Sequence, residues 1–388
     1  MIRRDDQVIS VCDDQSGTMT GRSGREGVFL RVAWRDGLIC SIETVPPAPD
    51  LPWLMPGLID LQVNGFSGID FQNPQMTEGE LEVAVTGLRR SGCQGFLLTL
   101  ITDDWKLMLE KLGRLVEMRR HRGDLARAMI GFHLEGPFLS AREGFRGAHS
   151  PAAMCDPPPH AVDEIIDTVG TLPVLLTVAP ERPGMFEFIR EATRRGLIVS
   201  LGHSAATSEQ VSTAIRCGAK AITHFGNGCP QVWPRHDNWF WTVVDCEGLA
   251  VGLIPDGIHL PERVFRGIHH ALGDRHQIYY TTDAMSAAGM GPGTYPLGRE
   301  MLSVGDDEIV RQPGQPNYAG SALTPLQGIS RSAQMLSVPW REVWHRFSVG
   351  PAALLGRDLE FEIGAPWFAV SVSEGGEGRM GEITVFSP

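Results

Sequence analysis

The 388-residue chain has 46 acidic and 34 basic side chains, a net charge of −12, and a composition of 42% hydrophobic and 21% charged residues. This composition is typical of a globular protein, and an acidic excess spread along the chain argues against nucleic acid or a membrane surface as the partner. Seven cysteines lie far apart without a Cys-x-x-Cys pair, and the first residues, MIRRDDQVIS, are too charged for a signal peptide. We therefore expect a soluble, cytoplasmic protein.

The first fifty residues predict short antiparallel strands. Apolar and polar positions alternate in QVISV (7–11), VFLRVAW (28–34) and GLICSIETV (37–45), and turn-rich stretches such as DDQSGTMTGRSG (13–24) separate them. Alternation of this kind is typical of strands with one buried face. A proline-rich stretch at 46–52 then marks a boundary.

From residue 53 onward the pattern changes to apolar strands followed by amphipathic helices. The eight predicted strands are 57–64, 95–101, 128–135, 173–179, 197–203, 220–225, 249–256 and 277–283. Eight such units in about 250 residues predict a TIM (β/α)8 barrel, an α/β fold. A doubly wound sheet is the alternative, but neither a G-x-G-x-x-G after the first strand nor a P-loop is present.

Helix boundaries are marked by capping residues. The clearest helical runs are 78–92, 104–121, 183–196 and 208–218. Thr77, three residues before Glu80, indicates one N-terminus, and Ser208 indicates another. Glycines at 92, 196 and 218 are placed as expected after helix C-termini.

The last hundred residues are expected to cover the barrel and then rejoin the N-terminal strands. The glycine- and proline-rich stretch 285–320 is predicted to form a loop over the barrel mouth, followed by two helices at 324–337 and 340–348. Strands at 367–372 and 381–387 flank a turn at 374–378. Because neither chain end alone could bury a face, we expect a small β-sandwich module from residues 1–52 plus 357–388, beside a barrel domain at 53–356.

Polar side chains gather at the carboxyl ends of the predicted barrel strands. They are Gln62, Asn64, Glu135, His203, His224, Asp256, His259 and Asp283. A single histidine there is more simply a polar residue at a strand end. All these ends surround one mouth, however, and unpaired carboxylates and imidazoles buried together would cost several kcal/mol each. A bound metal ion removes that cost.

One carboxylate and two imidazoles match a catalytic metal site with an open position for water. Glu135, His203 and His224 are the candidate ligands. The pKa of a metal-bound water falls toward ~7, which provides a nucleophile at neutral pH. Asp283, after the last strand, could take up the water proton and pass it to a leaving nitrogen. The pattern predicts metal-assisted hydrolysis.

The motifs QVNG, HLEGPF, GHS, THFGNG, DGIH and TTDA occur in this order on these strands. Together they resemble the N-acetylglucosamine-6-phosphate deacetylases of the amidohydrolase superfamily, over nearly the whole chain. The resemblance implies removal of acetate from an N-acetylated amino sugar phosphate, here N-acetylglucosamine 6-phosphate, giving glucosamine 6-phosphate.

The resemblance also implies roles for individual residues. It gives Glu135, His203 and His224 as metal ligands and Asp283 as the general base and acid. His149 matches a histidine that polarises the substrate carbonyl. The residues matched to substrate binding are Gly136, Asn227, Gly228, Arg235 and His259.

The metal content follows from a departure after the first strand. Many superfamily members have two histidines there and bind two metals, whereas this chain has Gln62 and Asn64. Because neutral amides are poor zinc ligands, we expect one divalent ion, zinc in the first place and iron or another ion as the alternative, with both amides lining the site.

The segment 229–238, CPQVWPRHDN, departs from the Arg-Glu-Pro-Gly pattern of the family. Arg235 keeps the spacing of the arginine that reaches the phosphate across a homodimer interface, but its neighbours differ, and Asp237 could neutralise it locally. Two alternatives therefore stay open. One is hydrolysis of a related substrate, a galacto epimer or a non-phosphorylated N-acetyl sugar. The other is a non-catalytic sugar-binding regulator, which would need neither Asp283 nor an open metal site.

Overall fold

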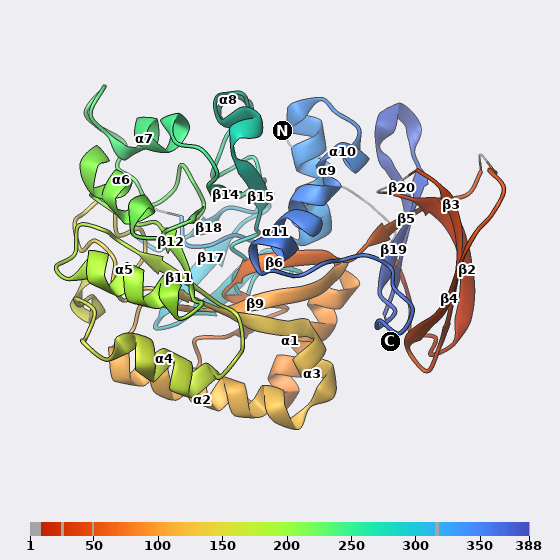
Figure 1. Ribbon diagram of the computed structural model, residues 1–388, viewed down its shortest axis with the longest axis horizontal. Coiled ribbons are helices and arrows are strands. Elements are labelled where there is room, and N and C mark those ends of the chain that lie inside the picture. The colour runs from red at the N-terminus through yellow and green to blue at the C-terminus, as the bar shows by residue number, and fades with distance from the viewer. Residues whose placement is uncertain (1–8, 25–26, 49, 315–317, 388) are drawn as a thin grey trace.

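The computed structural model describes residues 9–24, 27–48, 50–314 and 318–387 (Figure 1). It contains an eight-stranded parallel barrel sheet, a separate seven-stranded sheet and a small three-stranded sheet. The seven-stranded sheet combines the two chain ends, drawn in red and blue on one side of the barrel. The predicted TIM barrel with a module built from both termini is confirmed. In the described part of the chain, no helix has the length and apolar character needed to cross a membrane.

All eight predicted barrel strands are present and pair in sequence order. They are β6 (Leu58–Val63), β9 (Cys93–Ile101), β10 (Met129–Glu135), β11 (Val174–Val178), β12 (Ile198–Leu201), β13 (Ala221–Ile222), β14 (Ala250–Leu253) and β15 (Gln277–Tyr280). Every pair of neighbours is parallel. Their carboxyl ends therefore lie at one mouth.

The barrel interior is layered. Each strand contributes an apolar side chain to one buried cluster, composed of Ile59, Leu61, Leu97, Ile130, Leu175, Ile198, Ala221, Ala250 and Tyr279. Ala352 and Leu354 of α11 (Val349–Leu354) join this cluster, and this short helix was missed because glycine and proline interrupt its pattern.

A buried polar layer accompanies the apolar one. The His133 ring contacts the Leu61 carbonyl and the Thr177 hydroxyl at 3.0 and 2.7 Å. Thr223 joins the Thr177 and Ser200 hydroxyls at 2.7 and 2.6 Å. Because these groups satisfy one another, the barrel tolerates polar side chains in its interior.

The helices of the barrel units are α1 (Glu78–Arg90), α2 (Trp105–His121), α3 (Gly123–Ala128), α4 (Ala161–Val169), α5 (Met185–Arg194), α6 (Ser208–Arg216), α7 (Trp239–Asp245) and α8 (Glu262–Leu272). Thr77 and Glu80 form the predicted capping box. The Ser208 cap is wrong, because the extended Thr207 caps α6 by accepting from the Gln210 amide. The glycines after α1, α5 and α6 all have positive φ, as expected.

After β15 the chain forms a hairpin and then further helices. The hairpin sheet consists of β16 (Gly293–Leu297), β17 (Glu300–Val304) and β18 (Val310–Arg311), where only a loop was expected. Its turn is anchored by Asp70, whose carboxylate accepts from the Gly298 amide at 2.7 Å. Residues 315–317 of the predicted loop lie outside the described residues. The expected helix pair is present as α9 (Pro325–Leu336) and α10 (Trp340–Trp344).

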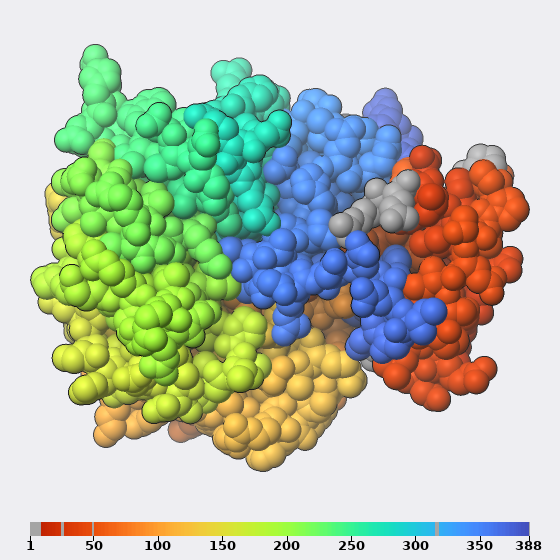
Figure 2. Space-filling view, in the orientation of Figure 1, coloured from red at the N-terminus to blue at the C-terminus, as the bar shows by residue number. Residues whose placement is uncertain are grey.

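The terminal sheet has the order β1-β20-β19-β5-β2-β3-β4. Its strands are β1 (Ile9–Cys12), β2 (Gly17–Ser23), β3 (Phe29–Arg35), β4 (Leu38–Thr44), β5 (Trp53–Pro56), β19 (Ala369–Glu374) and β20 (Met380–Phe386). Trp34 of β3 stacks on Trp367 with ring centroids 4.5 Å apart, and it also contacts Phe386 of β20. The two halves of the sheet thus enclose a core in the manner of a sandwich, and Figure 2 shows both chain ends in one lobe.

Two details of this module differ from the sequence prediction. The stretch 13–24 contains β2, because pairing with β3 holds its Gly, Ser and Thr residues in extended conformation. Strand β5 pairs with β19 and β2, which favours a module boundary after Pro56 in place of the predicted boundary after residue 52. Residues 7 and 8 of the first predicted strand lie outside the described residues.

We predict that Trp367→Ala destabilises the protein by about 3–5 kcal/mol, because it removes the large buried partner of Trp34. Trp367→Phe should cost much less, since the buried Trp367 Nε1 has no hydrogen-bond partner among the described residues. Urea unfolding followed by circular dichroism checks both variants. Equal losses for Phe and Ala would contradict the packing explanation.

Candidate active site

Three predicted ligands meet at the barrel mouth. Glu135 ends β10, and His203 and His224 follow β12 and β13. His224 Nε2 lies 2.8 Å from Glu135 Oε1, His203 Nε2 lies 3.3 Å from the same oxygen, and the two Nε2 atoms are 3.1 Å apart. All three side chains are buried. Residues separated by up to 89 positions in the chain thus place their donor atoms around one point.

The ring of His203 is held in a defined orientation. Its Nδ1 lies 2.9 Å from the Phe145 carbonyl oxygen, which can only accept, so Nδ1 carries the proton and Nε2 offers a lone pair. Gly147 and Gly228 lie against this ring, since a Cβ on either would lie 2.8 or 2.7 Å from one of its atoms. Any larger residue at these two positions would displace the imidazole.

The backbone at the site is strained. His203, His224 and Asp283 have φ values of +46°, +30° and +51°. Residues other than glycine rarely adopt this left-handed conformation, and it persists where surrounding contacts impose it. Three of the predicted functional residues thus share a conformation that turns each side chain at its strand end.

The donor set fits a divalent metal ion. Ligands about 2.0–2.2 Å from one tetrahedral ion lie roughly 3.3–3.6 Å apart, slightly more than the 2.8–3.3 Å separations found here. The lone pair on His203 Nε2, facing a second imidazole and a carboxylate, is also stabilised by a shared cation. The donor atoms of Glu135, His149 and His203 likewise all lie within 4.8 Å of one another, so His149 borders the same point.

The electrostatics of Glu135 differ from those of an ordinary buried acid. Burial alone would raise its pKa, but the neighbouring imidazoles of His203 and His224 outweigh burial and hold the pKa well below its usual range. In return, the Glu135 carboxylate outweighs burial at His224 and raises the pKa of that imidazole. The cluster therefore retains a negative charge available to a cation.

Asp283 lies beside this cluster, and its pKa is shifted upward, opposite to that of Glu135. Burial, and then the charge of Glu135, raise the pKa of Asp283 to about 7. Asn64 Nδ2 donates to Asp283 Oδ1 at 2.7 Å, so Asn64 supports this carboxyl group in addition to lining the site. A bound cation would favour the ionised form again. Asp283 can thus both accept and release a proton near neutral pH.

His149 is buried next to Glu135 and is neutral. Burial, and then the neighbouring His203, lower the pKa of His149 to about 3. Its Nδ1 lies 2.9 Å from the Thr102 hydroxyl, and its Nε2 lies 3.7 Å from Glu135 Oε2. The carboxylate favours the His149 proton on Nε2, and the one proton of the Thr102 hydroxyl is then shared between Nδ1 and the Glu135 carbonyl oxygen, 3.3 Å away.

The predicted substrate residues lie at different depths. Gly136 follows Glu135, and a Cβ on Gly136 would lie 2.1 Å from the Thr102 hydroxyl oxygen. Asn227 is partly buried, and its side-chain amide donates to the His224 carbonyl at 3.2 Å. Gln62 is buried with its Nε2 unpartnered among the described residues.

His259 forms a buried pair with Asp256. Its Nδ1 lies 2.6 Å from Asp256 Oδ2, and Asp256 Oδ1 accepts from the backbone amides of Ile258 and His259. Burial opposes the charge on both side chains, but the pairing outweighs it, raising the pKa of His259 and lowering that of Asp256. Asp283 also raises the pKa of His259, which favours the charged form of this imidazole.

The divergent segment 229–238 packs onto the loop that supports His203. Trp233 contacts Phe145 with ring centroids 6.0 Å apart, and Trp239 donates from Nε1 to the Ser204 carbonyl at 3.2 Å. Arg235 is exposed, and in the described chain its guanidinium forms no ion pair, including with Asp237. Its carbonyl accepts from the Trp241 indole at 3.0 Å.

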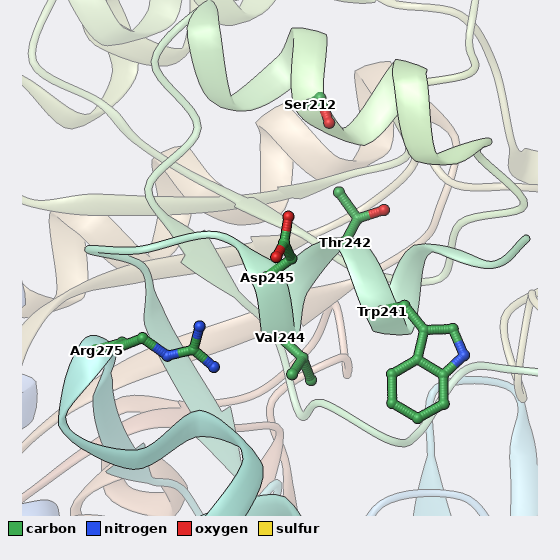
Figure 3. Close-up of a pocket in the computed structure, with 6 residues that line it drawn as sticks. All are labelled: Ser212, Trp241, Thr242, Val244, Asp245 and Arg275. Atoms are coloured by element: carbon green, nitrogen blue, oxygen red, sulfur yellow. The ribbon is translucent and has the colours of Figure 1, made fainter. Parts of the chain in front are cut away.

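A separate hollow of about 520 Å³ lies between α6, α7 and the turn at Gly273–Arg275. Figure 3 shows Arg275 and Trp241 at its two sides with Asp245 between them. None of the predicted catalytic or ligand residues lines it. The hydrolytic chemistry therefore belongs to the barrel mouth.

Sequence reasoning missed several residues that support the site. Phe145 orients His203 through a backbone carbonyl, and Thr102 contacts His149 from the end of β9. Neither contact leaves a sequence signal, because a main-chain acceptor is independent of residue type and the Thr102 hydroxyl meets His149 only in the folded barrel. Asp60 did offer one, since a charged residue inside an apolar strand is unusual.

Comparison with known proteins is consistent with this site. No protein-family model matches the chain. An N-acetylglucosamine-6-phosphate deacetylase from Danio rerio is 31% identical over 314 residues, covering 78% of this chain and 75% of that protein. An N-acetylgalactosamine-6-phosphate deacetylase from Escherichia coli O157:H7 is 29% identical over 332 residues and covers 85% of both chains.

Solved structures agree over almost the full length. A variant of the Mycobacterium smegmatis N-acetyl-D-glucosamine-6-phosphate deacetylase, in complex with N-acetyl-D-glucosamine-6-phosphate, superposes with a TM-score of 0.81 at 26% identity, covering 95% of this chain and 99% of that chain. The Thermotoga maritima N-acetylglucosamine-6-phosphate deacetylase gives a TM-score of 0.79 at 25% identity, covering 93% and 98%. The chain belongs to the N-acetylglucosamine-6-phosphate deacetylase family of the amidohydrolase superfamily.

Proposed function

We propose that this protein hydrolyses the acetamide of N-acetylglucosamine 6-phosphate to glucosamine 6-phosphate and acetate. The observation that carries the proposal is the convergence of Glu135, His203 and His224 within 3.3 Å of one another, beside Asp283. The relatives named as deacetylases of this sugar phosphate support the substrate. The galacto epimer is the second candidate, because a relative named for it matches 85% of both chains.

We infer that Glu135, His203 and His224 hold one divalent ion, zinc in the first place. Two imidazoles and a carboxylate suit zinc and also accept iron or other divalent ions. When bound, such an ion supplies Lewis-acid activation of the attacking water and of the acetamide carbonyl. Gln62 and Asn64 offer only neutral amides, which supports a single ion.

Asp283 acts as the general base and then as the general acid. Its carboxylate takes a proton from the attacking water and returns it to the departing amine nitrogen, so that acetate and a free amine result. A pKa raised toward about 7 suits both directions of transfer. Asn64 holds the carboxylate oxygen at 2.7 Å and orients it for the transfer.

His149 stabilises the charge that develops on the acetamide oxygen. A neutral imidazole with its proton on Nε2 donates a hydrogen bond without competing for the proton of the water. Thr102 fixes this orientation from the opposite ring nitrogen. Gly136, next to Glu135, has no side chain because a Cβ there would collide with the Thr102 hydroxyl that contacts His149.

Phosphate recognition combines a cation with backbone amides. His259, paired with Asp256, presents positive charge near Asp283, and the loop at Asn227 and Gly228 follows His224 directly. Arg235 is exposed and unpaired in the described chain, which suits contact with the phosphate of a second subunit. We therefore infer a homodimer. All seven cysteines are free, which supports a cytoplasmic location.

The first test is acetate release from four sugars by zinc-loaded protein. These are N-acetylglucosamine 6-phosphate, its galacto epimer and the two non-phosphorylated forms. We expect the gluco 6-phosphate to be the preferred substrate, and Asp283→Asn should lower kcat by about 10²–10⁴-fold with metal content unchanged. A preference for the galacto epimer or a free sugar would replace the substrate, and full activity of Asp283→Asn would refute the catalytic role.

Replacing a ligand should remove metal and activity together. We predict that Glu135→Gln loses its stoichiometric zinc, measured by mass spectrometry after dialysis, because the cluster loses its anionic member. His133→Gln is the matched control on the same strand. Both ring nitrogens of His133 already have partners, so this variant should retain the ion. Stoichiometric zinc in Glu135→Gln would overturn the ligand assignment.

Arg235→Ala should raise KM for the phosphorylated sugar and leave kcat nearly constant, because it removes binding that is equal in the ground and transition states. Arg263→Ala on α8 serves as a control for a general loss of positive charge. Steady-state kinetics at two salt concentrations measures both variants. An unchanged KM for Arg235→Ala would place phosphate recognition elsewhere.

A further inference from the structure

The first and last barrel strands meet at a seam closed by the carboxylate of Asp60. Strand β6 has no ladder with β15 in the described chain, and a single bridge joins Val63 to Ala284. Asp60 is fully buried beside this seam. Its Oδ1 accepts from the Thr281 hydroxyl, and its Oδ2 accepts from the Thr282 hydroxyl, each at 2.6 Å. One side chain thus holds two consecutive residues of the opposite strand.

A buried carboxylate is a costly way to close a seam. Apolar side chains of similar volume often do so at lower free energy. Burial raises the pKa of Asp60 to about 6, opposed by the bonds from Thr281 and Thr282. The Thr282 amide also donates to both oxygens, at 3.1 and 3.2 Å. Donors from Thr281 and Thr282 thus converge on Asp60, more than barrel closure alone requires.

The Thr282 hydroxyl links Asp60 to the backbone around Asp283. It donates to Asp60 Oδ2 and accepts from the Ala284 amide at 3.0 Å. The second bond spans residue 283, whose φ is +51°. A threonine hydroxyl that receives the amide two residues later favours a turn at the residue between them. Asp283 is thereby turned into the strained conformation of the site.

Asp283 and its neighbours make further hydrogen bonds on both sides of the turn. Ser321 donates from its amide to the Asp283 carbonyl at 2.8 Å and from its hydroxyl to the Thr282 carbonyl at 2.6 Å. These bonds hold the outer side of the chain. Among the described residues, the carboxylate itself receives one side-chain bond, from Asn64. On the β6 side, the Asn64 backbone amide donates to the Ala284 carbonyl at 2.7 Å, and Asp60 holds the turn through the Thr282 hydroxyl.

We propose that Asp60 is a positioning residue, which through the Thr282 hydroxyl holds Asp283 in the left-handed conformation that presents its carboxylate to the Glu135–His203–His224 cluster. The inference rests on the proposed function in assigning Asp283 the proton transfer. Thr281 is not part of this positioning, because its hydroxyl binds Asp60 without contacting the turn at residue 283.

The chain offers a matched pair of variants. Thr281→Val and Thr282→Val each remove one buried hydroxyl bond of 2.6 Å to Asp60, and the new side chain has nearly the same shape. A role limited to barrel closure would affect both variants alike. We expect Thr282→Val to lower kcat by about 10²-fold with KM and zinc content unchanged, because a displaced proton-transfer group loses its geometry. Thr281→Val should keep most of kcat, and Thr282→Ser should restore it.

Equal kcat losses in the two valine variants at equal loss of melting temperature would overturn the proposal. Should Thr282→Val fail to fold, Asp60→Asn provides the same comparison with Thr281→Val. Asp60→Asn keeps the volume and weakens the acceptor for Thr282, so we expect a selective loss of kcat. A loss confined to KM would overturn the proposal as well.

Crystal structures of the valine variants, or of Asp60→Asn in place of a misfolded Thr282→Val, test the positioning without any activity. We expect residue 283 to leave positive φ, and Asp283 to lose its 2.7 Å contact with Asn64, in Thr282→Val but not in Thr281→Val. Unchanged geometry in Thr282→Val would overturn the proposal. If the wild type releases acetate from none of the four sugars, the proposed function fails, and these structures alone still decide the positioning.

Discussion

The arrangement of this molecule depends on one buried carboxylate, that of Glu135. An isolated anion in a barrel would cost several kcal/mol, so the surrounding strands must supply positive charge or donors. Here two imidazoles that follow β12 and β13 lie within 3.3 Å of it, and they outweigh burial in setting its pKa. Burial, and then this same anion, raise the pKa of Asp283, so the Glu135–His203–His224 cluster and Asp283 are electrostatically coupled.

The barrel interior has separate apolar and polar layers, and the polar layer lets it hold this buried cluster. The apolar layer inside the barrel is closed by α11, and the network of His133, Thr177, Ser200 and Thr223 satisfies its own polar atoms. Backbone strain at the site lies at the strand ends, at His203, His224 and Asp283. Each strained residue is held by a neighbour on another strand or loop, which is how a rigid scaffold maintains a strained site.

Segment 229–238, which diverges from the family pattern, packs against the loop that orients His203. Trp233 packs on Phe145, whose carbonyl orients His203, and Pro230 lies against Gly144 of the same loop. The divergent residues therefore pack behind the loop that orients His203, while Arg235 is exposed.

The sequence by itself determined the eight barrel strands and their order, because a strand buried on both faces must be apolar throughout and each is followed by an amphipathic helix. It also indicated Glu135, His203, His224 and Asp283, since polar residues at such strand ends are few. The tertiary structure alone decided what holds them: a backbone carbonyl at Phe145, a hydroxyl at Thr102 and the seam carboxylate of Asp60. Contacts between distant segments and main-chain acceptors leave no local pattern, so their partners exist only once the barrel closes.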